Sequence, residues 1–333
     1  MPDAKAWKQI VAARRILMLT HTKPDGDGLG SLAALQEALT ALGKEVRVIL
    51  PSEPAAKYAF LAGSEKFEVL GRDVQADQFP RDWDLILVVD TCTWDQLEGL
   101  RGLIEDYSDR VLVIDHHMTR DDLRHQELVD VGAAAAGEIV ARLMERQAVA
   151  ITPTIAESLF VSLVSDTGWF RFPSVTPAVL HLGARLVEQG ARPSVVYERL
   201  YQSESLAKMN LIREALSTLT LSPEGDVAWF WLTRDTFARS GAKLSDTENI
   251  IDECQKVAGV LVGLLFTEIE DGSVRVSLRS KRDVDMAAVS ARFGGGGHAR
   301  AAGCRLPGPL PAARRAVLEA VYAALGRPPC PWM

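Results

Sequence analysis

The sequence has few cysteines, no excess of basic residues and no long apolar run. Its four cysteines show no C-x-x-C spacing, which argues against a disulfide framework and against a zinc site of the cysteine type. No apolar stretch has the length of a membrane span, so no membrane partner is expected. Residues 1–15 are polar and of mixed charge, unlike a secretion signal. We therefore expect a cytoplasmic protein.

The charge balance restricts which nucleic acids or other anions the protein is expected to bind. The formal net charge is −7, and a chain without a basic excess gains little from counterion release on long nucleic acid. A short anionic substrate stays compatible with this charge wherever one local site is positive. With 333 residues, of which 47% are hydrophobic, the chain has the length and composition of two globular domains.

One stretch near the N-terminus combines a histidine with two carboxylates. The apolar run 16–19 predicts a buried strand, and apolar residues at helical spacing predict a helix over 32–42. Between them lie His21, Asp25 and Asp27. Like charges at short range raise one another's pKa, and a cation relieves that repulsion. Histidine with carboxylates is a ligand set for Mn²⁺, Fe²⁺ or Zn²⁺.

Two other interpretations of this stretch exist. The aspartates could be ordinary turn and capping residues, with His21 a strand-end residue. The glycines at 26, 28 and 30 also suggest a dinucleotide loop. Their spacing is G-x-G-x-G rather than G-x-G-x-x-G, and Asp27 would repel a pyrophosphate, so we set the second interpretation aside. The first stays open on this stretch alone.

Two later strands are also predicted to end in polar residues. The apolar run 85–89 leads into Asp90, and the run 111–114 leads into Asp115, His116 and His117. Unbroken apolar strands that alternate with helices indicate a parallel sheet covered on both faces. Ligands of such sheets bind outside the carboxyl ends of the strands. These side chains are therefore expected at one edge of the sheet, beside the first group.

The two adjacent histidines are expected to have different roles. Neighbouring side chains of a strand point to opposite faces, so one imidazole would ligate a metal and the other would contact substrate, with Asp115 orienting an imidazole. A purely structural histidine pair is the alternative. Asp166 follows a predicted helix over 152–165 and precedes Gly168. It is a further candidate ligand, although an ordinary turn aspartate would look the same.

The C-terminal half carries a possible anion site. We predict a helix over 245–257 and two strands, 259–269 and 273–280, joined by a hairpin turn at 271–272. Four consecutive glycines, 294–297, then precede His298. Their backbone amides could bind an anion or could form a flexible loop. Nearby basic residues such as Arg279 favour the anion, because arginine pairs well with phosphate.

Taken together, these motifs resemble the DHH phosphoesterase superfamily, in order and in separation. The resemblance rests on His21-x-x-x-Asp25-x-Asp27, then Asp90, then Asp115-His116-His117, then Asp166-Thr167-Gly168, and it covers nearly the whole chain. The glycine run before His298 resembles the DHH-associated domain of one branch. The resemblance implies an α/β fold, with an N-terminal parallel-sheet domain, a smaller C-terminal α/β domain and the active site in the cleft between. The expected domains are 1–190 and 221–333, with a helical linker over 191–220.

The resemblance also implies roles for individual residues. It implies two metal ions, usually Mn²⁺, with Mg²⁺ or Co²⁺ possible. His21 and Asp25 would hold one ion, Asp27, His116 and Asp166 the other, and Asp90 would bridge them. His117 would meet the scissile phosphate, with Asp115 behind it. The implied substrate-binding residues belong to the second domain and are Arg279, Ser280, Gly295, Gly296, Gly297 and His298.

The implied activity is hydrolysis of phosphate esters in short nucleotides. The two-domain layout looks most like bacterial oligoribonucleases that cut short RNA or DNA oligonucleotides and dephosphorylate 3′-phosphoadenosine 5′-phosphate, a nucleoside bisphosphate. A cyclic-di-AMP or linear-dinucleotide signalling phosphodiesterase is the nearest alternative. A non-catalytic nucleotide-binding module is a more distant one, since a sensor has no need of both metals. A homodimer is compatible with this resemblance.

Overall fold

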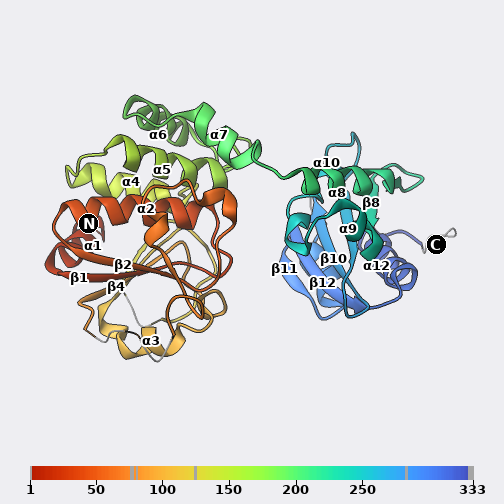
Figure 1. The fold of residues 1–333 in the computed structure, drawn as a ribbon, viewed down its shortest axis with the longest axis horizontal. Coiled ribbons are helices and arrows are strands. Elements are labelled where there is room, and N and C mark those ends of the chain that lie inside the picture. Colours follow the sequence, from red (N-terminus) through yellow and green to blue (C-terminus); the bar gives the residue numbers. More distant parts are fainter. Residues whose placement is uncertain (1, 76–78, 80–81, 124–125, 282–283, 329–333) are drawn as a thin grey trace. The chain divides into compact units, whose positions relative to one another are not determined.

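The computed structural model describes residues 2–75, 79, 82–123, 126–281 and 284–328. Backbone contacts divide the chain into two compact units, residues 1–203 and 204–333. Each unit has its own sheet and its own core (Figure 1). Among the described helices, none is both long enough and apolar enough to cross a bilayer.

The first unit is built on a six-stranded sheet whose order is β3-β2-β1-β4-β5-β6. Every neighbouring pair is parallel, which confirms the predicted parallel sheet. β4 and β5 are buried along their whole length, as expected for strands covered on both faces. The strands are β1 (Arg15–Leu19), β2 (Glu45–Leu50), β3 (Glu68–Val69), β4 (Leu85–Val89), β5 (Val111–Asp115) and β6 (Gln126–Val129).

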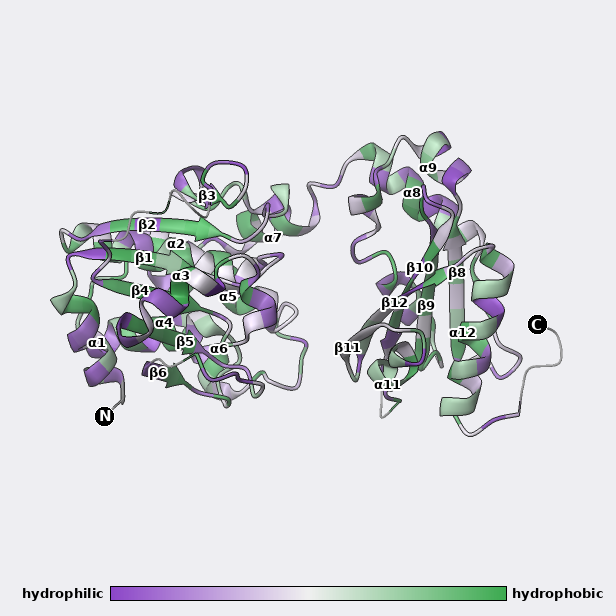
Figure 2. Cartoon of the chain, turned by 90° about the horizontal axis from the view of Figure 1, so that it is seen from below, coloured by the Kyte–Doolittle hydropathy of each residue, from purple (hydrophilic) through white to green (hydrophobic). Residues whose placement is uncertain are grey.

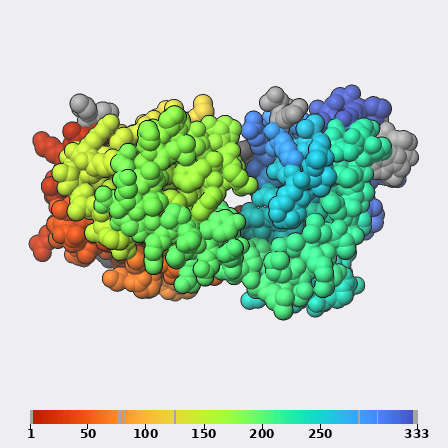
Figure 3. Space-filling model, turned by 90° about the horizontal axis from the view of Figure 1, so that it is seen from above, coloured from red at the N-terminus to blue at the C-terminus, as the bar shows by residue number. Residues whose placement is uncertain are grey.

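Helices cover both faces of this sheet. Ile16 and Met18 of β1 face the core under the larger helical layer, whereas Leu17 and Leu19 face the core that holds Ile104. Figure 1 shows α2, α4 and α5 on the first face and α3 on the other. Figure 3 shows the outer surface of the larger layer, in yellow-green and green. The helices are α1 (Pro2–Ala12), α2 (Gly26–Ala41), α3 (Arg101–Asp106), α4 (Ala136–Arg146), α5 (Pro153–Asp166), α6 (Pro177–Glu188) and α7 (Pro193–Tyr201).

Small residues allow α2 and α5 to approach closely. A side chain at Gly30 of α2 would lie 2.4 Å from the carbonyl oxygen of Ser158 in α5. α5 begins at a capping Thr152, whose hydroxyl accepts a hydrogen bond from the Ile155 amide at 3.2 Å, with proline at the first helical position. This packing brings the start of α2 and the end of α5 to the same edge of the sheet.

The second unit holds a mixed sheet of order β11-β12-β10-β9-β8-β7. Only the β8–β9 pair is parallel among the described pairs of this sheet. In Figure 2, apolar residues concentrate in the strands of each unit. The elements are β7 (Thr220–Leu221), β8 (Val227–Leu232), β9 (Val262–Glu268), β10 (Ser273–Ser280), β11 (Gly296–His298) and β12 (Ala301–Pro307), with α8 (Leu206–Ser217), α9 (Arg234–Ser240), α10 (Asp252–Gln255), α11 (Met286–Ala291) and α12 (Leu310–Ala324).

Several local expectations can be compared with this unit. The β9–β10 hairpin is confirmed, and Gly272 in its turn has φ +83°. The single helix expected over 245–257 is wrong: a 3₁₀ turn, Leu244–Thr247, is separated from the short α10 by Asn249 at φ +64°. The expected connection 191–220 contains α7, which belongs to the first unit, and α8, which belongs to the second.

Candidate metal centre

The first ligand group lies where β1 gives way to α2. Asp25 caps α2: its Oδ1 accepts hydrogen bonds from the amides of Asp27 at 2.9 Å and Gly28 at 3.2 Å. His21 Nε2 lies 3.6 Å from the same Oδ1. His21 Nδ1 lies 2.8 Å from the Thr22 carbonyl oxygen, and donation to that carbonyl leaves Nε2 with a lone pair that faces the carboxylate.

Asp90 lies between the two histidines that the strands bring together. Its Oδ2 is 3.4 Å from His21 Nε2, and its Oδ1 is 3.4 Å from His116 Nε2. The residue is buried and has φ +66°, a backbone conformation that non-glycine residues seldom adopt. A side chain at Gly28 would lie 2.5 Å from Thr20 Oγ1 and 3.4 Å from Asp90 Oδ2. The glycine at position 28 therefore leaves room for the Asp90 carboxylate.

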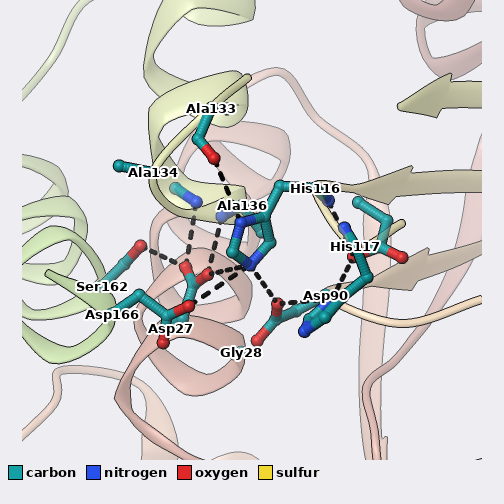
Figure 4. Close-up of polar contacts among 12 residues, drawn as sticks. Asp27, Gly28, Asp90, His116, His117, Ala133, Ala134, Ala136, Ser162 and Asp166 are labelled. Atoms are coloured by element: carbon teal, nitrogen blue, oxygen red, sulfur yellow. Dashed lines mark hydrogen bonds and ion pairs between the residues drawn. The ribbon is translucent and has the colours of Figure 1, made fainter. Parts of the chain in front are cut away.

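The second ligand group contains His116, Asp27 and Asp166 (Figure 4). His116 Nε2 lies 3.5 Å from Asp27 Oδ2 and 3.3 Å from Asp166 Oδ2. Its Nδ1 faces the carbonyl oxygen of Ala133 at 3.2 Å, which orients the ring. Asp27 comes from the first turn of α2 and Asp166 is the last residue of α5, so segments far apart in sequence supply one group.

Asp27 is enclosed by hydrogen-bond donors that the sequence analysis missed. Its carboxylate accepts from the amides of Ala136 at 2.6 Å and Gly137 at 3.0 Å, at the N-terminus of α4. The hydroxyl of Ser31 donates from 3.3 Å, and the hydroxyl of Ser162 donates as well. A helix N-terminus favours negative charge. The two backbone amides have no side-chain signal in the sequence, and the two serines come from different helices, α2 and α5.

His117 and Asp115 form a hydrogen-bonded pair that adjoins Asp90, whose Oδ1 lies 3.9 Å from His117 Nδ1. Asp115 is fully buried, and its Oδ1 lies 2.7 Å from His117 Nδ1. The same oxygen accepts from the amide of His116 at 2.8 Å, which fixes the carboxylate. The His117 side chain is 48% exposed. This contact orients the half-exposed imidazole through Nδ1.

The electrostatics of the cluster favour a cation. Burial, followed by the charges of Asp90 and Asp166, raises the pKa of Asp27 well above its usual range. Burial, followed by the charge of Asp90, also raises the pKa of Asp166, against the effect of His116. Burial lowers the pKa of His116, but its contacts with Asp166 and Asp90 outweigh this and raise it to about 11. A bound cation would relieve this repulsion among the carboxylates.

Two buried polar atoms indicate that a metal ion would fit this cluster. Among the described residues, Asp90 Oδ1 and His116 Nε2 are buried without a hydrogen-bond partner, and both face the carboxylate cluster. Buried polar atoms are ordinarily paired. The His21–Asp25–Asp90 group and the Asp27–His116–Asp166 group each offer ligand atoms within 4.8 Å of one another. Nitrogen and carboxylate oxygen donors suit Mn²⁺ or a similar divalent ion.

Five of the six expected substrate-binding residues lie on β10 and β11, two strands of the second unit that are separated by β12. Arg279 and Ser280 end β10, and Gly296, Gly297 and His298 form β11, which pairs with β12. Arg279 Nε lies 3.8 Å from Asp252 Oδ1, and the Ser280 hydroxyl donates to the Val284 carbonyl at 2.8 Å. The side chain of His298 lies outside the described part of the chain.

The glycine run is ordered by packing rather than looped. A side chain at Gly295 would lie 2.3 Å from the carbonyl oxygen of Gly303. Gly297 has φ +133°, and a side chain there would lie 2.5 Å from the Ala301 carbonyl oxygen. The flexible-loop alternative is therefore wrong for 296–298, because these residues form a strand. Close packing against β12 explains why glycine is required at both positions.

Comparison with known proteins gives the family. Residues 15–163 match the DHH family, N-terminal domain, and residues 230–326 match the DHHA1 domain. The chain is 30% identical over 98% of its length to "Bifunctional oligoribonuclease and PAP phosphatase NrnA" of Thermus thermophilus, covering 97% of that protein. It is 24% identical to the protein of the same name from Bacillus subtilis, over 87% of this chain and 89% of that protein.

A solved structure agrees with the fold. The crystal structure of an exopolyphosphatase-related protein from Bacteroides fragilis superposes with a TM-score of 0.89 at 22% sequence identity. The match covers 97% of this chain and 97% of that chain. It therefore includes both the parallel sheet of the first unit and the mixed sheet of the second.

Proposed function

Because the chain belongs to the DHH family of phosphoesterases, we propose that it is a metal-dependent hydrolase of short oligoribonucleotides that also converts 3′-phosphoadenosine 5′-phosphate to AMP. Relatives named for both activities align over nearly the full chain. The first unit supplies a histidine–carboxylate cluster of the kind that binds divalent ions. We propose that products are mononucleotides.

The metal assignment rests on one observation: among the described residues, Asp90 Oδ1 and His116 Nε2 are buried without a hydrogen-bond partner, and both face carboxylate oxygens. We propose that His21 and Asp25 hold one ion, that Asp27, His116 and Asp166 hold a second, and that Asp90 contacts both. Mn²⁺ suits this donor set, and Mg²⁺ or Co²⁺ are alternatives. When bound, such a pair supplies the Lewis acidity and the activated water for displacement at phosphorus.

The chain's own residues would then orient the reaction. Asp115 fixes the His117 ring through Nδ1 at 2.7 Å, and this contact comes first among the causes that raise the pKa of His117. A protonated His117 can donate to a phosphoryl oxygen or to the leaving oxygen. Its half-exposed edge leaves room for a substrate. Asp90, in its left-handed conformation, keeps one oxygen toward each histidine.

We propose that the second unit binds the nucleotide and its remaining phosphate. Arg279 offers a guanidinium at the end of β10, and a side chain at Gly296 would meet no atom within 4 Å, so the backbone is open on that side. Arginine binds phosphate in a bidentate manner. His298 and Ser280 complete the proposed set. Substrates with two phosphates close together would be favoured over long strands, since extra nucleotides gain no further contact here.

The metal assignment is tested with Asp90→Ala. This variant should lose Mn²⁺-dependent hydrolysis of a dinucleotide almost completely, because each ligand group loses the Asp90 oxygen that faces its histidine. Asp95→Ala, an exposed aspartate on a nearby 3₁₀ turn, is the matched control. Circular dichroism should show both variants folded. Activity of Asp90→Ala at the wild-type level would refute the assignment.

Substrate choice is tested with pApA, 3′-phosphoadenosine 5′-phosphate, cyclic di-AMP and a long RNA, each with Mn²⁺, Mg²⁺ and Co²⁺. We expect the first two to be cleaved fastest. Arg279→Ala should raise KM by about tenfold, because one charged hydrogen bond to the substrate is lost. Its metal content should not change. Arg305→Ala, exposed on β12, is the control. Fastest cleavage of cyclic di-AMP would favour a signalling phosphodiesterase instead.

A further inference from the structure

The turn that follows Asp166 has an unusual backbone. Gly168, Trp169 and Phe170 have φ values of +54°, +60° and +60°, so two aromatic residues occupy a conformation that is disfavoured for residues with a Cβ. The turn is held by hydrogen bonds: the Trp169 amide donates to the Val164 carbonyl at 2.7 Å. The Thr167 hydroxyl donates to the Leu163 carbonyl at 2.6 Å and accepts from the Phe170 amide at 3.2 Å.

This backbone directs the Trp169 ring onto α7. The indole meets the ring of Tyr197 edge-on, with centroids 5.0 Å apart, and the ring of Tyr201 at 5.8 Å. On its other side it meets Phe160 of α5 at 6.0 Å. The two tyrosines contact each other at 5.1 Å. We call the four rings, Phe160, Trp169, Tyr197 and Tyr201, the aromatic brace.

Asp166 depends on this turn more than the other acidic ligand in its group does. Asp27 is fully buried and accepts four hydrogen bonds. The Asp166 side chain is 28% exposed, and among the described residues His116 is its polar partner. The position of its carboxylate is therefore set mainly by the backbone where α5 ends. That backbone is continuous with the left-handed turn, whose Trp169 ring contacts the other three rings of the brace.

We propose that Trp169 is a positioning residue for Asp166, and that Tyr197 and Tyr201 act through it. The brace balances the disfavoured backbone conformation at 168–170 with ring contacts. Without the indole, the turn can relax toward ordinary conformations and carry Asp166 away from His116. The inference rests on the metal site proposed above. The residues of the brace would set the affinity of the Asp166 ion without being ligands themselves.

The brace also connects the end of the first unit to this ligand. α7 ends at Tyr201, two residues before the boundary at 203. Tyr201 is 35 positions from Asp166 in sequence and 46% exposed. Truncating it removes ring contacts without opening a large buried cavity. A Tyr201 substitution therefore measures the contribution of the brace and should leave the protein folded.

The test is calorimetric titration of the full chain with Mn²⁺. Wild type should bind two ions. Trp169→Ala should weaken the binding of one ion by about tenfold, which is the lower end of what supporting residues contribute to metal affinity. Tyr201→Ala should weaken the binding of the same ion by about threefold. Trp169→Phe, which keeps a ring, should restore most of the affinity. The double variant should be no weaker than Trp169→Ala, because both changes act on one contact. Leu180→Ala, exposed on α6, is the control.

The outcomes separate the brace from the metal site. A wild type that binds no Mn²⁺ would refute the metal site itself. A wild type that binds two ions, with unchanged affinities in Trp169→Ala and Tyr201→Ala, would refute the brace alone. Equal weakening of both ions together with a lower unfolding temperature would show general destabilisation and would also refute it. Loss confined to one ion, with rescue by phenylalanine, supports it.

Discussion

The two ligand groups lie on either side of Asp90 but differ in how firmly their carboxylates are held. Asp27 of one group is fully buried and has four donors, two of them amides at the start of α4. Asp25 of the other group has a side chain that is 49% exposed and is held by two amides of its own turn. One carboxylate is thus fixed by three helices, and the other by a local cap.

This difference indicates unequal ion sites. A ligand that cannot move loses little entropy when an ion arrives, whereas a ligand on an exposed turn must be ordered first. The Asp27 group should therefore bind its ion more tightly. The Asp25 group should hold its ion more loosely and exchange it more readily with solvent.

The largest expected effect compares Asp27→Ala with Asp25→Ala. We expect Asp27→Ala to weaken its ion by more than about 100-fold and Asp25→Ala to weaken the other by about tenfold, since supporting contacts alone contribute that range. Mn²⁺ titration of the full chain would measure both, and thermal unfolding would control for loss of the fold. Equal losses in the two variants would contradict the comparison.

Convergence of the ligands could be predicted, because it follows from general rules. Parallel strands end at one edge, and polar residues after three strands must meet there. This rule applies to His21, Asp90 and His116, and in the structure each histidine Nε2 lies 3.4 Å from an Asp90 oxygen. The parallel sheet itself follows from the unbroken apolar runs in β4 and β5.

The enclosure of Asp27 could not be predicted in the same way. Its strongest donors are backbone amides of an alanine-rich segment, and amides have no sequence signature. The position of α4 depends on Gly137, where a side chain would lie 1.9 Å from Ser162 Oγ. Such a contact joins residues 25 positions apart. Likewise, the helix expected over 245–257 is interrupted, because Asn249 takes a φ of +64° between the 3₁₀ turn and α10.

A smaller effect is expected for Ser162→Ala. The Ser162 hydroxyl donates to Asp27, so its loss removes one of four donors and leaves the ligand itself in place. Affinity for the tighter ion should fall by about tenfold. Ser165→Ala is a matched control on the same helix, because that hydroxyl donates to the Val161 carbonyl at 2.8 Å instead. No change in Ser162→Ala would mean that the enclosure does not create the difference between the two sites.

The smallest effect is expected for Asp115→Asn, which leaves both ligand groups intact and isolates His117. The hydrogen bond and the charge of Asp115 raise the pKa of His117. Its proton is present at low pH and is lost as pH rises through that pKa. With asparagine the pKa falls, so the alkaline limb of the pH–rate profile should move to lower pH. At neutral pH, kcat should drop about fivefold, part of the 10²–10⁴ that a positioned proton donor contributes.

The pH profile distinguishes this role from metal binding. Loss of a ligand would lower Mn²⁺ affinity, and extra Mn²⁺ would restore the rate, whereas a change in His117 alone would shift the profile at saturating Mn²⁺. The Asp115 oxygen that contacts His117 also accepts from the His116 amide at 2.8 Å, and the asparagine side-chain oxygen can keep that bond. An unshifted alkaline limb in Asp115→Asn, with full Mn²⁺ binding, would show that the proton of His117 does not limit the reaction.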